Sequence, residues 1–252
     1  MKTYAPVTEA VLDALKTIVG AEYVLTEPEK LEQYQTDEET DPRKFHLPEA
    51  VVLPKDAQEI AAVIKLANTY DVPVTVRSGG TSLAGGAIPV CGGIVLLMER
   101  LNKIIAVSYT HLRDHETPEH LVTRDQVYAV EVVTPTGEIV ELGARLKKKS
   151  TGYCLEQLIM GSEGTLGIIT KATLKLQPIP PYRFDLLAVF SDPEQALDVV
   201  PKIMQAGINP TSVEYMDNSY VRGTAEYLEF KGAPHYENGI YVMDEANLES
   251  HG

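Results

Sequence analysis

The chain has 252 residues, which is enough to bury a substantial core in one large or two smaller domains. Its composition, 44% hydrophobic and 23% charged, is ordinary for a soluble globular protein. The net charge of −14 argues against a nucleic-acid partner, because such a partner selects a basic surface. No stretch approaches the roughly eighteen apolar residues of a membrane span, so we expect none.

The N-terminus and the cysteines predict a cytoplasmic protein. Residues 1–6 lack the apolar core of a secretory signal. Two cysteines, Cys91 and Cys154, do not form a disulfide framework, which favours a reducing compartment. Cys154 is a candidate nucleophile, although its setting is more typical of a small, half-buried thiol.

Residues 1–46 are expected to form an N-terminal helical segment. Apolar residues recur at helical spacing over residues 8–19, and Gly20 suits a helix end. Residues 26–29, Thr-Glu-Pro-Glu, have capping-box spacing with a proline in the first turn, which predicts a second, short helix.

Residues 47–178 are expected to form the main domain, and its first part reads as a β-α-β unit. Residues 50–54 and 72–77 have the pattern of buried strands, and residues 56–70 that of an amphipathic helix between them. Two further strands are predicted at residues 93–97 and 103–107.

A change of pattern marks the second part of this domain. Two β-rich runs within residues 127–142 flank Pro-Thr-Gly and predict a hairpin. A helix over residues 155–160 and a strand over residues 167–176 should follow.

Pro178, Pro180 and Pro181 predict a domain boundary, with a second domain over residues 182–252. Its expected elements are a strand (184–190), a helix from a capping Ser191 to Ala206, a strand (212–216) and a helix (220–227).

Two glycine-rich stretches, roughly eighty positions apart, carry the functional signal. The first is Val-Arg-Ser-Gly-Gly-Thr-Ser-Leu-Ala-Gly-Gly-Ala at residues 76–87, directly after a predicted strand. Closely spaced glycines allow positive φ angles and bring backbone amides against a ligand, and successive inward amides suit an anion such as a pyrophosphate. The second is Gly-Ser-Glu-Gly-Thr-Leu-Gly-Ile-Ile-Thr at residues 161–170.

The order of residues excludes two common phosphate loops. Neither Gly-x-x-x-x-Gly-Lys-Ser/Thr nor Gly-x-Gly-x-x-Gly is present in these stretches. Residues 73–82 instead resemble the pyrophosphate loop of FAD-linked oxidases of the vanillyl-alcohol oxidase type. Residues 161–170 resemble that family's second flavin-contacting segment, and the glycolate oxidase FAD subunit and D-lactate dehydrogenases are the nearest branch in pattern. The alternative is two unrelated glycine turns between strands.

The resemblance implies an α+β protein: a two-part PCMH-type FAD-binding domain, incomplete here, followed by the start of an α+β cap domain. It assigns the cofactor FAD, held without a covalent bond because no histidine lies near the first loop. It places the pyrophosphate at Arg77, Ser78, Gly79, Gly80, Thr81, Ser82, Gly85 and Gly86, where the arginine adds charge and the hydroxyls add donors. It places the flavin and ribityl side at Glu163, Gly164, Gly167, Ile168 and Ile169. Gly164 and Gly167 can also be read as simple turn residues.

The implied activity is oxidation of a small 2-hydroxy acid, of the glycolate or D-lactate type, to the 2-oxo acid by hydride transfer to flavin. A partner protein or subunit could accept the electrons. Two alternatives remain open: a different FAD-dependent reaction on the same fold, and a catalytically inactive flavin-binding fragment or interaction subunit.

Residues 107–120 depart from the family pattern. They resemble a reading frame of a sequencing-library adapter and replace several dozen residues expected in the family, so we interpret them as a foreign junction; a natural deletion is the alternative. His111 and His115 within them have i, i+4 spacing with Glu116 adjacent, but no third ligand supports a metal site. The chain also lacks the family's late cap-domain residues, so no catalytic residue is assigned and this exact chain is expected to be inactive.

Overall fold

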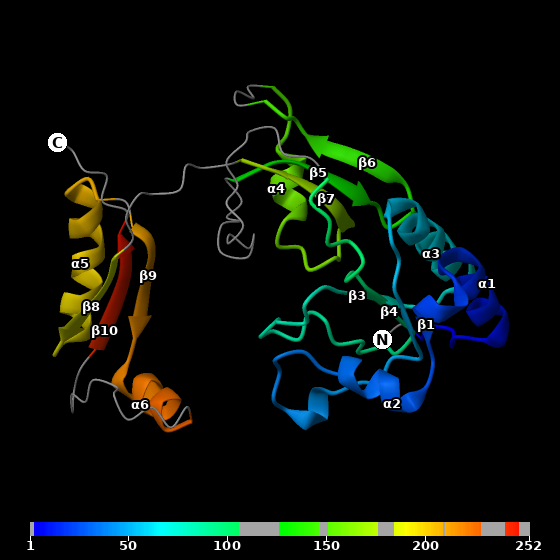
Figure 1. Ribbon diagram of the computed structural model, residues 1–252, viewed down its shortest axis with the longest axis horizontal. Helices are drawn as coiled ribbons and strands as arrows, with labels where there is room; N and C mark the ends of the chain where they lie inside the picture. The colour runs from blue at the N-terminus through cyan, green and yellow to red at the C-terminus, as the bar shows by residue number, and fades with distance from the viewer. Residues whose placement is uncertain are drawn as a thin grey trace. The chain divides into compact units, whose positions relative to one another are not determined.

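The computed structural model describes residues 3–105, 126–146, 151–175, 184–208, 210–227 and 240–246 (Figure 1). The chain divides into two compact units, Met1–Leu176 and Gln177–Gly252, and each is described by itself. The predicted proline boundary, the junction at residues 107–120 and its two histidines lie outside the described residues.

Two helices begin the first unit. Helix α1 (Glu9–Val19) starts at Thr8, whose hydroxyl accepts a hydrogen bond from the amide of Val11. Helix α2 (Pro28–Leu31) is also present, but the predicted capping box is wrong. Its N-cap is Glu27, with no side-chain cap, because Pro28 takes the first helical position where its fixed φ suits the helix.

The first sheet has the order β1-β2-β4-β3. Strand β1 (Val24–Leu25) is antiparallel to β2 (Ala50–Val52), whereas β2 and β3 (Val74–Arg77) both run parallel to β4 (Ile94–Leu97). Helix α3 (Ala57–Tyr70) connects β2 and β3 as predicted, but β4 lies between them.

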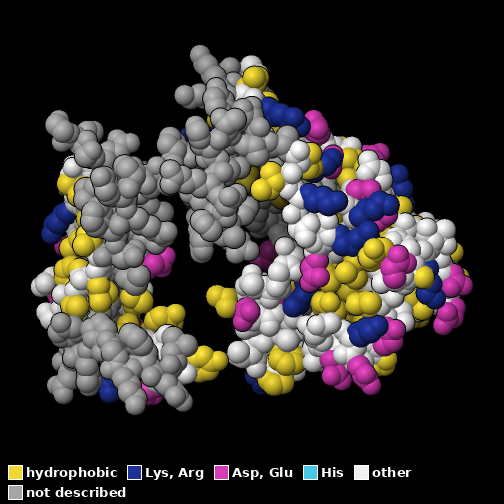
Figure 2. Space-filling view, viewed as in Figure 1, with side chains coloured by type: hydrophobic (Ala, Val, Ile, Leu, Met, Phe, Trp, Pro, Cys, Tyr) yellow, Lys and Arg dark blue, Asp and Glu magenta, His cyan; other side chains and the backbone are white. Residues whose placement is uncertain are grey.

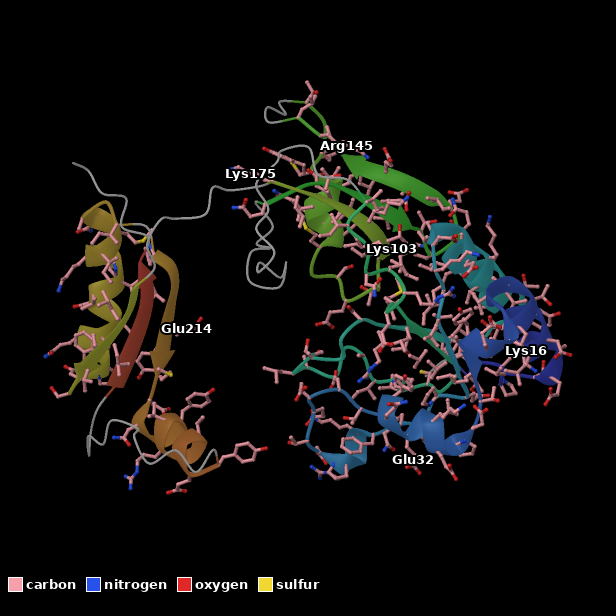
Figure 3. All side chains as sticks on the ribbon, viewed as in Figure 1. Lys16, Glu32, Lys103, Arg145, Lys175 and Glu214 are labelled. Atoms are coloured by element: carbon pink, nitrogen blue, oxygen red, sulfur yellow. The ribbon has the colours of Figure 1, made fainter. Side chains whose placement is uncertain are left out.

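This sheet is buried on both faces, which explains the continuous apolar runs of β2 and β4. On one face Val52, Ile94 and Leu96 pack with residues of α1 and α3. On the other face Val51, Val95 and Leu97 pack with Leu31, Tyr34 and their neighbours. Figure 3 labels Lys16 on α1 and Glu32 directly after α2. The segment after α2 packs through Tyr34 against the face of the sheet opposite α1 and α3.

The strand predicted at residues 103–107 is wrong in its described part. Residues 101–105 are not in a strand, and Ile104 and Ile105 are 73% and 71% exposed. Apolar character alone therefore did not place them in the sheet, because a strand also needs a neighbour to accept its backbone hydrogen bonds.

The second sheet completes the first unit in the order β6-β5-β7. Strands β5 (Val127–Val133) and β6 (Ile139–Gly143) form the predicted hairpin, and β7 (Ile168–Leu174) pairs with β5, also antiparallel. Helix α4 (Leu155–Ile159) comes just before the second glycine-rich stretch. Asn68 of α3 donates to the carbonyl of Pro135 at 2.8 Å, which ties the hairpin to the helix.

The second unit is a three-stranded antiparallel sheet, in the order β8-β10-β9, with two helices. Helix α5 begins after Asp192, whose carboxylate accepts the amide of Glu194 at 2.9 Å, so the predicted cap at Ser191 is one residue early. The five elements are β8 (Phe184–Phe190), α5 (Pro193–Gln205), β9 (Pro210–Met216), α6 (Asn218–Tyr227) and β10 (Ile240–Ala246). The predicted α+β class is confirmed, and β10 is an element that sequence reasoning missed.

On the face that Figure 2 shows, the surface of the first unit carries both acidic and basic side chains, and neither charge covers it alone. Among the described residues, no helix has both the length and the apolar character needed to cross a bilayer.

Candidate functional site

The first glycine-rich loop leaves the end of β3, at the carboxyl edge of the parallel strands, where α/β folds place their ligand loops. Gly80 and Gly85 have φ angles of +71° and +77°, as the glycine pattern predicted. Gly79 and Gly86 lie outside the left-handed region, so the conformational argument does not apply to them.

Ser82 closes the loop on itself. Its Oγ accepts hydrogen bonds from the amides of Ala84 and Gly86, each at 3.2 Å. Within the described part of the chain, the amides of Gly79, Gly80, Thr81 and Ser82 have no acceptor. Four successive amides without an acceptor are donors that a phosphate oxygen could accept from.

Arg77 does not project freely beside this loop. Its Nη1 donates to the carbonyl oxygen of Thr36 at 2.6 Å, and its guanidinium carbon lies 5.7 Å from the ring centroid of Tyr34. Burial raises the pKa of the Tyr34 hydroxyl, and so does the charge of Glu99, while the charge of Arg77 acts in the opposite direction. A Cβ on Gly80 would lie 2.2 Å from Nη2 of Arg77, so the guanidinium packs directly against the backbone of the loop at Gly80.

The second glycine-rich stretch forms a tight turn between α4 and β7. The amide of Ser162 donates to the carbonyl of Ile159 at 3.1 Å, and that of Thr165 to Ser162 at 2.9 Å. Glu163 and Gly164 have φ angles of +51° and +76°. For glutamate this left-handed conformation costs about 1–2 kcal/mol, a strain that is typical of functional turns.

The fold brings the two stretches together, although they lie far apart in sequence. A Cβ on Gly86 would lie 3.0 Å from Oε2 of Glu163, and one on Gly164 would lie 3.1 Å from Cγ2 of Val76 on β3. A Cβ on Gly167 would lie 2.6 Å from Cγ1 of Val132 on β5. Glycine is required most clearly at Gly167, by its close packing, and at Gly164, by its φ of +76°, so packing against β3 and β5 adds to their reading as simple turn residues.

A cavity of about 540 Å³ lies along this junction. Its apolar wall includes Val76, Met98, Leu101 and Ile159. Size and lining are those of a small-molecule or cofactor pocket. Six of the predicted site residues contribute to it: Ser78, Glu163, Gly164, Gly167, Ile168 and Ile169. The other predicted residues, all in the first loop, do not line it: Arg77, Gly79, Gly80, Thr81, Ser82, Gly85 and Gly86.

Lys171 is the one cation among the described residues that line the cavity, and it is already paired. Nζ of Lys171 lies 2.7 Å from Oε2 of Glu131, and the hydroxyl of Thr170 donates to Oε1 of the same carboxylate at 2.7 Å. Burial by itself raises the pKa of Glu131, but these two hydrogen bonds outweigh it and hold the pKa below its ordinary value. The pair joins β5 to β7 beside the cavity.

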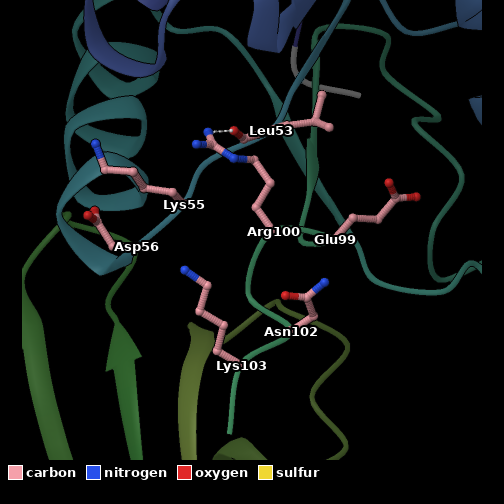
Figure 4. Close-up of a pocket in the computed structure, with 7 residues that line it drawn as sticks. All are labelled: Leu53, Lys55, Asp56, Glu99, Arg100, Asn102 and Lys103. Carbon is pink, nitrogen blue, oxygen red and sulfur yellow. Dashed lines mark hydrogen bonds between the residues drawn. The ribbon is translucent and has the colours of Figure 1, made fainter. Parts of the chain in front are cut away.

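A second hollow, of about 640 Å³, is polar and contains none of the predicted site residues (Figure 4). Arg100 donates to the carbonyl of Leu53 at 2.8 Å and stacks 3.5 Å from the ring centroid of Tyr23. Lys55 pairs with the buried Glu59 at 2.7 Å. These cations stabilise the fold at this edge of the sheet.

Sequence reasoning missed the residues that support the first loop, which are in residues 34–39. These residues carry no glycine or catalytic signature, so no local signal marks them. The thiol expectation is also corrected: Cys154 is exposed, as is Cys91. No cluster of three metal-ligating side chains occurs within the described ranges. No catalytic base is assigned.

Comparison with known proteins gives two family matches. Residues 48–113 match the FAD binding domain, and residues 179–248 match the C-terminal domain of FAD linked oxidases. The first match includes the whole of the first glycine-rich loop.

Three relatives illustrate the range of sequence similarity. An uncharacterized FAD-linked oxidoreductase of Mycobacterium tuberculosis is 34% identical over 80% of this chain and 53% of its own. D-lactate dehydrogenase of Anaerostipes hadrus is 32% identical over 89% and 56%. Glycolate oxidase subunit GlcD of Bacillus subtilis is 28% identical over 81% and 53%.

The chain spans about half the length of the curated relatives it matches. The alignment with the Anaerostipes hadrus enzyme extends over 268 residues, more than the 252 of this chain, so that relative carries residues that this chain lacks within the matched stretch.

Solved structures show the fold. Alkyldihydroxyacetonephosphate synthase superposes with a TM-score of 0.70 at 18% identity, over 95% of this chain and 56% of its own. p-Cresol methylhydroxylase does so with a TM-score of 0.70 at 16% identity, over 98% and 63%.

Proposed function

The chain belongs to the FAD-linked oxidases, and from this premise we propose that it binds FAD without a covalent bond and that the intact protein oxidises a small 2-hydroxy acid to the 2-oxo acid. The observation that supports this most is the junction of the two glycine-rich stretches beside an apolar-walled cavity. The open amides of Gly79, Gly80, Thr81 and Ser82 would hold the pyrophosphate, with Gly85 and Gly86 allowing its approach and Arg77 supporting the loop.

The second stretch would bind the other end of the cofactor. Glu163, Gly164, Gly167, Ile168 and Ile169 line the cavity, and their backbone groups would hold the flavin and ribityl side. The apolar residues Val76, Met98, Leu101 and Ile159 would limit the access of water to a bound flavin. When bound, FAD supplies the acceptor for the two electrons of the oxidation, while the protein supplies orientation and electrostatics.

The substrate class rests on two relatives, one named D-lactate dehydrogenase at 32% identity and one named glycolate oxidase subunit at 28%. Oxidation of a 2-hydroxy acid removes the hydroxyl proton and the α-hydrogen with its electron pair, leaving a 2-oxo acid. Re-oxidation of the cofactor then requires an electron acceptor, which we propose to be a partner protein or subunit.

Two absorbance measurements test this proposal. Purified protein titrated with FAD should develop the structured absorption of a protein-bound flavin. Under anoxia, D-lactate or glycolate should bleach that absorption, whereas p-cresol should leave it unchanged. Protein that binds no FAD would refute the cofactor assignment.

Two alternatives correspond to other outcomes of the same experiment. A bound flavin that neither hydroxy acid reduces would favour a catalytically inactive flavin-binding protein. Reduction by p-cresol alone would favour a different reaction on the same fold.

A further inference from the structure

The first glycine-rich loop is held by a segment that precedes it by about forty residues (residues 34–39, called the clasp here). Three hydrogen bonds connect the two. Arg77 Nη1 donates to the carbonyl of Thr36 at 2.6 Å, the amide of Glu38 donates to the carbonyl of Ser82 at 3.1 Å, and the amide of Ala87 donates to Oδ2 of Asp37 at 3.3 Å. The bonds meet the start, the middle and the end of the loop.

Asp37 is the one side chain of the clasp that bonds the loop. Its two carboxylate oxygens have different tasks: Oδ2 accepts the amide of Ala87, and Oδ1 accepts the amide of Glu39 within the clasp at 3.0 Å. A single half-buried carboxylate thus connects the two backbones. Hydrogen bonds to a charged acceptor are stronger than neutral ones.

The clasp has its own contacts with the rest of the first unit, so its hydrogen bonds can restrict the conformation of the loop. Tyr34 packs beneath the first sheet, against the cluster that includes Val95 and Leu97. The hydroxyl of Thr36 donates to the carbonyl of Glu39 at 3.0 Å, and the Glu39 carboxylate pairs with Lys44. The clasp therefore has contacts of its own with the rest of the first unit, apart from those with the loop.

Loop order matters for binding because glycine loses more conformational freedom than other residues when it is fixed. If the loop is already ordered in the free protein, less conformational entropy is lost when the ligand binds, and the affinity for the ligand is higher. We propose that Asp37 is a positioning residue for the cofactor: it holds the loop in the conformation that leaves the amides of residues 79–82 without a protein acceptor, and it acts through the loop and not by contact with the cofactor. This inference rests on the proposed assignment of the loop to the FAD pyrophosphate.

Three variants test the inference. Asp37→Ala removes both carboxylate bonds, and Asp37→Asn keeps one acceptor oxygen in place of two. Glu38→Ala is the matched control, because it removes the same charge from the exposed neighbouring side chain while the bonding backbone amide of Glu38 remains. The first readout is amide hydrogen exchange over residues 78–88 in protein without FAD, and the second is the FAD dissociation constant from flavin fluorescence.

We expect Asp37→Ala to accelerate exchange at Ala87 and its neighbours and to weaken FAD binding, each by about tenfold. Asp37→Asn should be intermediate, which a general loss of folding would not produce, and Glu38→Ala should match the parent protein in both readouts. Circular dichroism identifies any variant that fails to fold; if Asp37→Ala does so, the asparagine variant decides.

The outcomes separate the inference from the proposed function. Exchange in the Asp37 variants equal to that of Glu38→Ala would overturn the inference, whatever the FAD affinity. Faster exchange with unchanged FAD affinity would also overturn it, because the loop order would then not serve binding. If the parent protein binds no FAD, the proposed function fails, and with it the role of Asp37 for this cofactor.

Discussion

Replacing Gly80 with alanine tests how far backbone geometry shapes the first loop. Gly80 has φ +71°, and an L-residue in this left-handed region costs about 1–2 kcal/mol. The new Cβ would also lie 2.2 Å from Nη2 of Arg77, so the guanidinium must move. Moving it breaks the 2.6 Å hydrogen bond to Thr36. A bond of this charged type contributes about 1.5–3 kcal/mol, part of which a flexible arginine recovers elsewhere.

We therefore expect Gly80→Ala to lower the free energy of unfolding of the first unit by about 2–4 kcal/mol. Urea denaturation followed by circular dichroism measures this. Gly79→Ala is the matched control, because Gly79 is not left-handed and the nearest atom to its Cβ is Cγ2 of Thr81 at 3.8 Å. Its effect should stay within about 1 kcal/mol, on the stabilising side.

A double-mutant cycle separates the two contributions to the Gly80 effect. In an Arg77→Ala background the clash is absent, so Gly80→Ala should cost only the backbone part, about 1–2 kcal/mol. Equal effects of alanine at positions 79 and 80, or an undiminished effect in the Arg77→Ala background, would refute the reasoning.

Three further predictions follow from single contacts. Gly167→Ala should lower the free energy of unfolding by about 1–3 kcal/mol through overpacking, since its Cβ would lie 2.6 Å from Cγ1 of Val132. Thermal melting measures this effect, and an unchanged melting temperature would contradict the close packing. Glu131 has a pKa held below its ordinary 4.5, so the stability that it contributes is present above that pH and is lost as the pH falls through the lower folded-state value. Glu131→Gln should therefore flatten the acid side of the stability curve, and a curve parallel to that of the parent protein would show that this carboxylate is not the cause. Arg77→Ala should weaken FAD binding less than Gly80→Val does in fluorescence titration, because the backbone amides remain; the reverse order would make the guanidinium the main anchor.

Local pattern predicted most of the secondary structure because the period of apolar residues reports which face is buried. Residues 8–19 and 56–70 became α1 and α3, and the Pro-Thr-Gly turn formed its hairpin. Errors occurred where a boundary depended on one residue. The caps of α2 and α5 shifted by one position because a proline took the first helical place in each.

The candidate site was predictable in part. The sequence by itself indicated that two glycine-rich stretches serve one ligand, and the close succession of glycines predicted positive φ angles in the first loop, which Gly80 and Gly85 adopt. It could not distinguish Gly79 from Gly80, because both are glycine and only the path of the loop decides which one takes a left-handed φ angle. The partner of Arg77 was not predictable either, since Thr36 lies 41 residues away and offers only its backbone carbonyl.

The sequence determined the types of the elements and the position of the glycines, since both follow from side-chain pattern and backbone freedom along the chain. Tertiary structure alone decided that β4 lies between β2 and β3, that Glu163 meets Gly86, and that the clasp holds the loop. In the last two contacts the side chain of Glu163, Asp37 or Arg77 meets a glycine or a backbone group. Backbone groups are nearly the same at every residue, so only the folded path of the chain selects which of them a side chain meets.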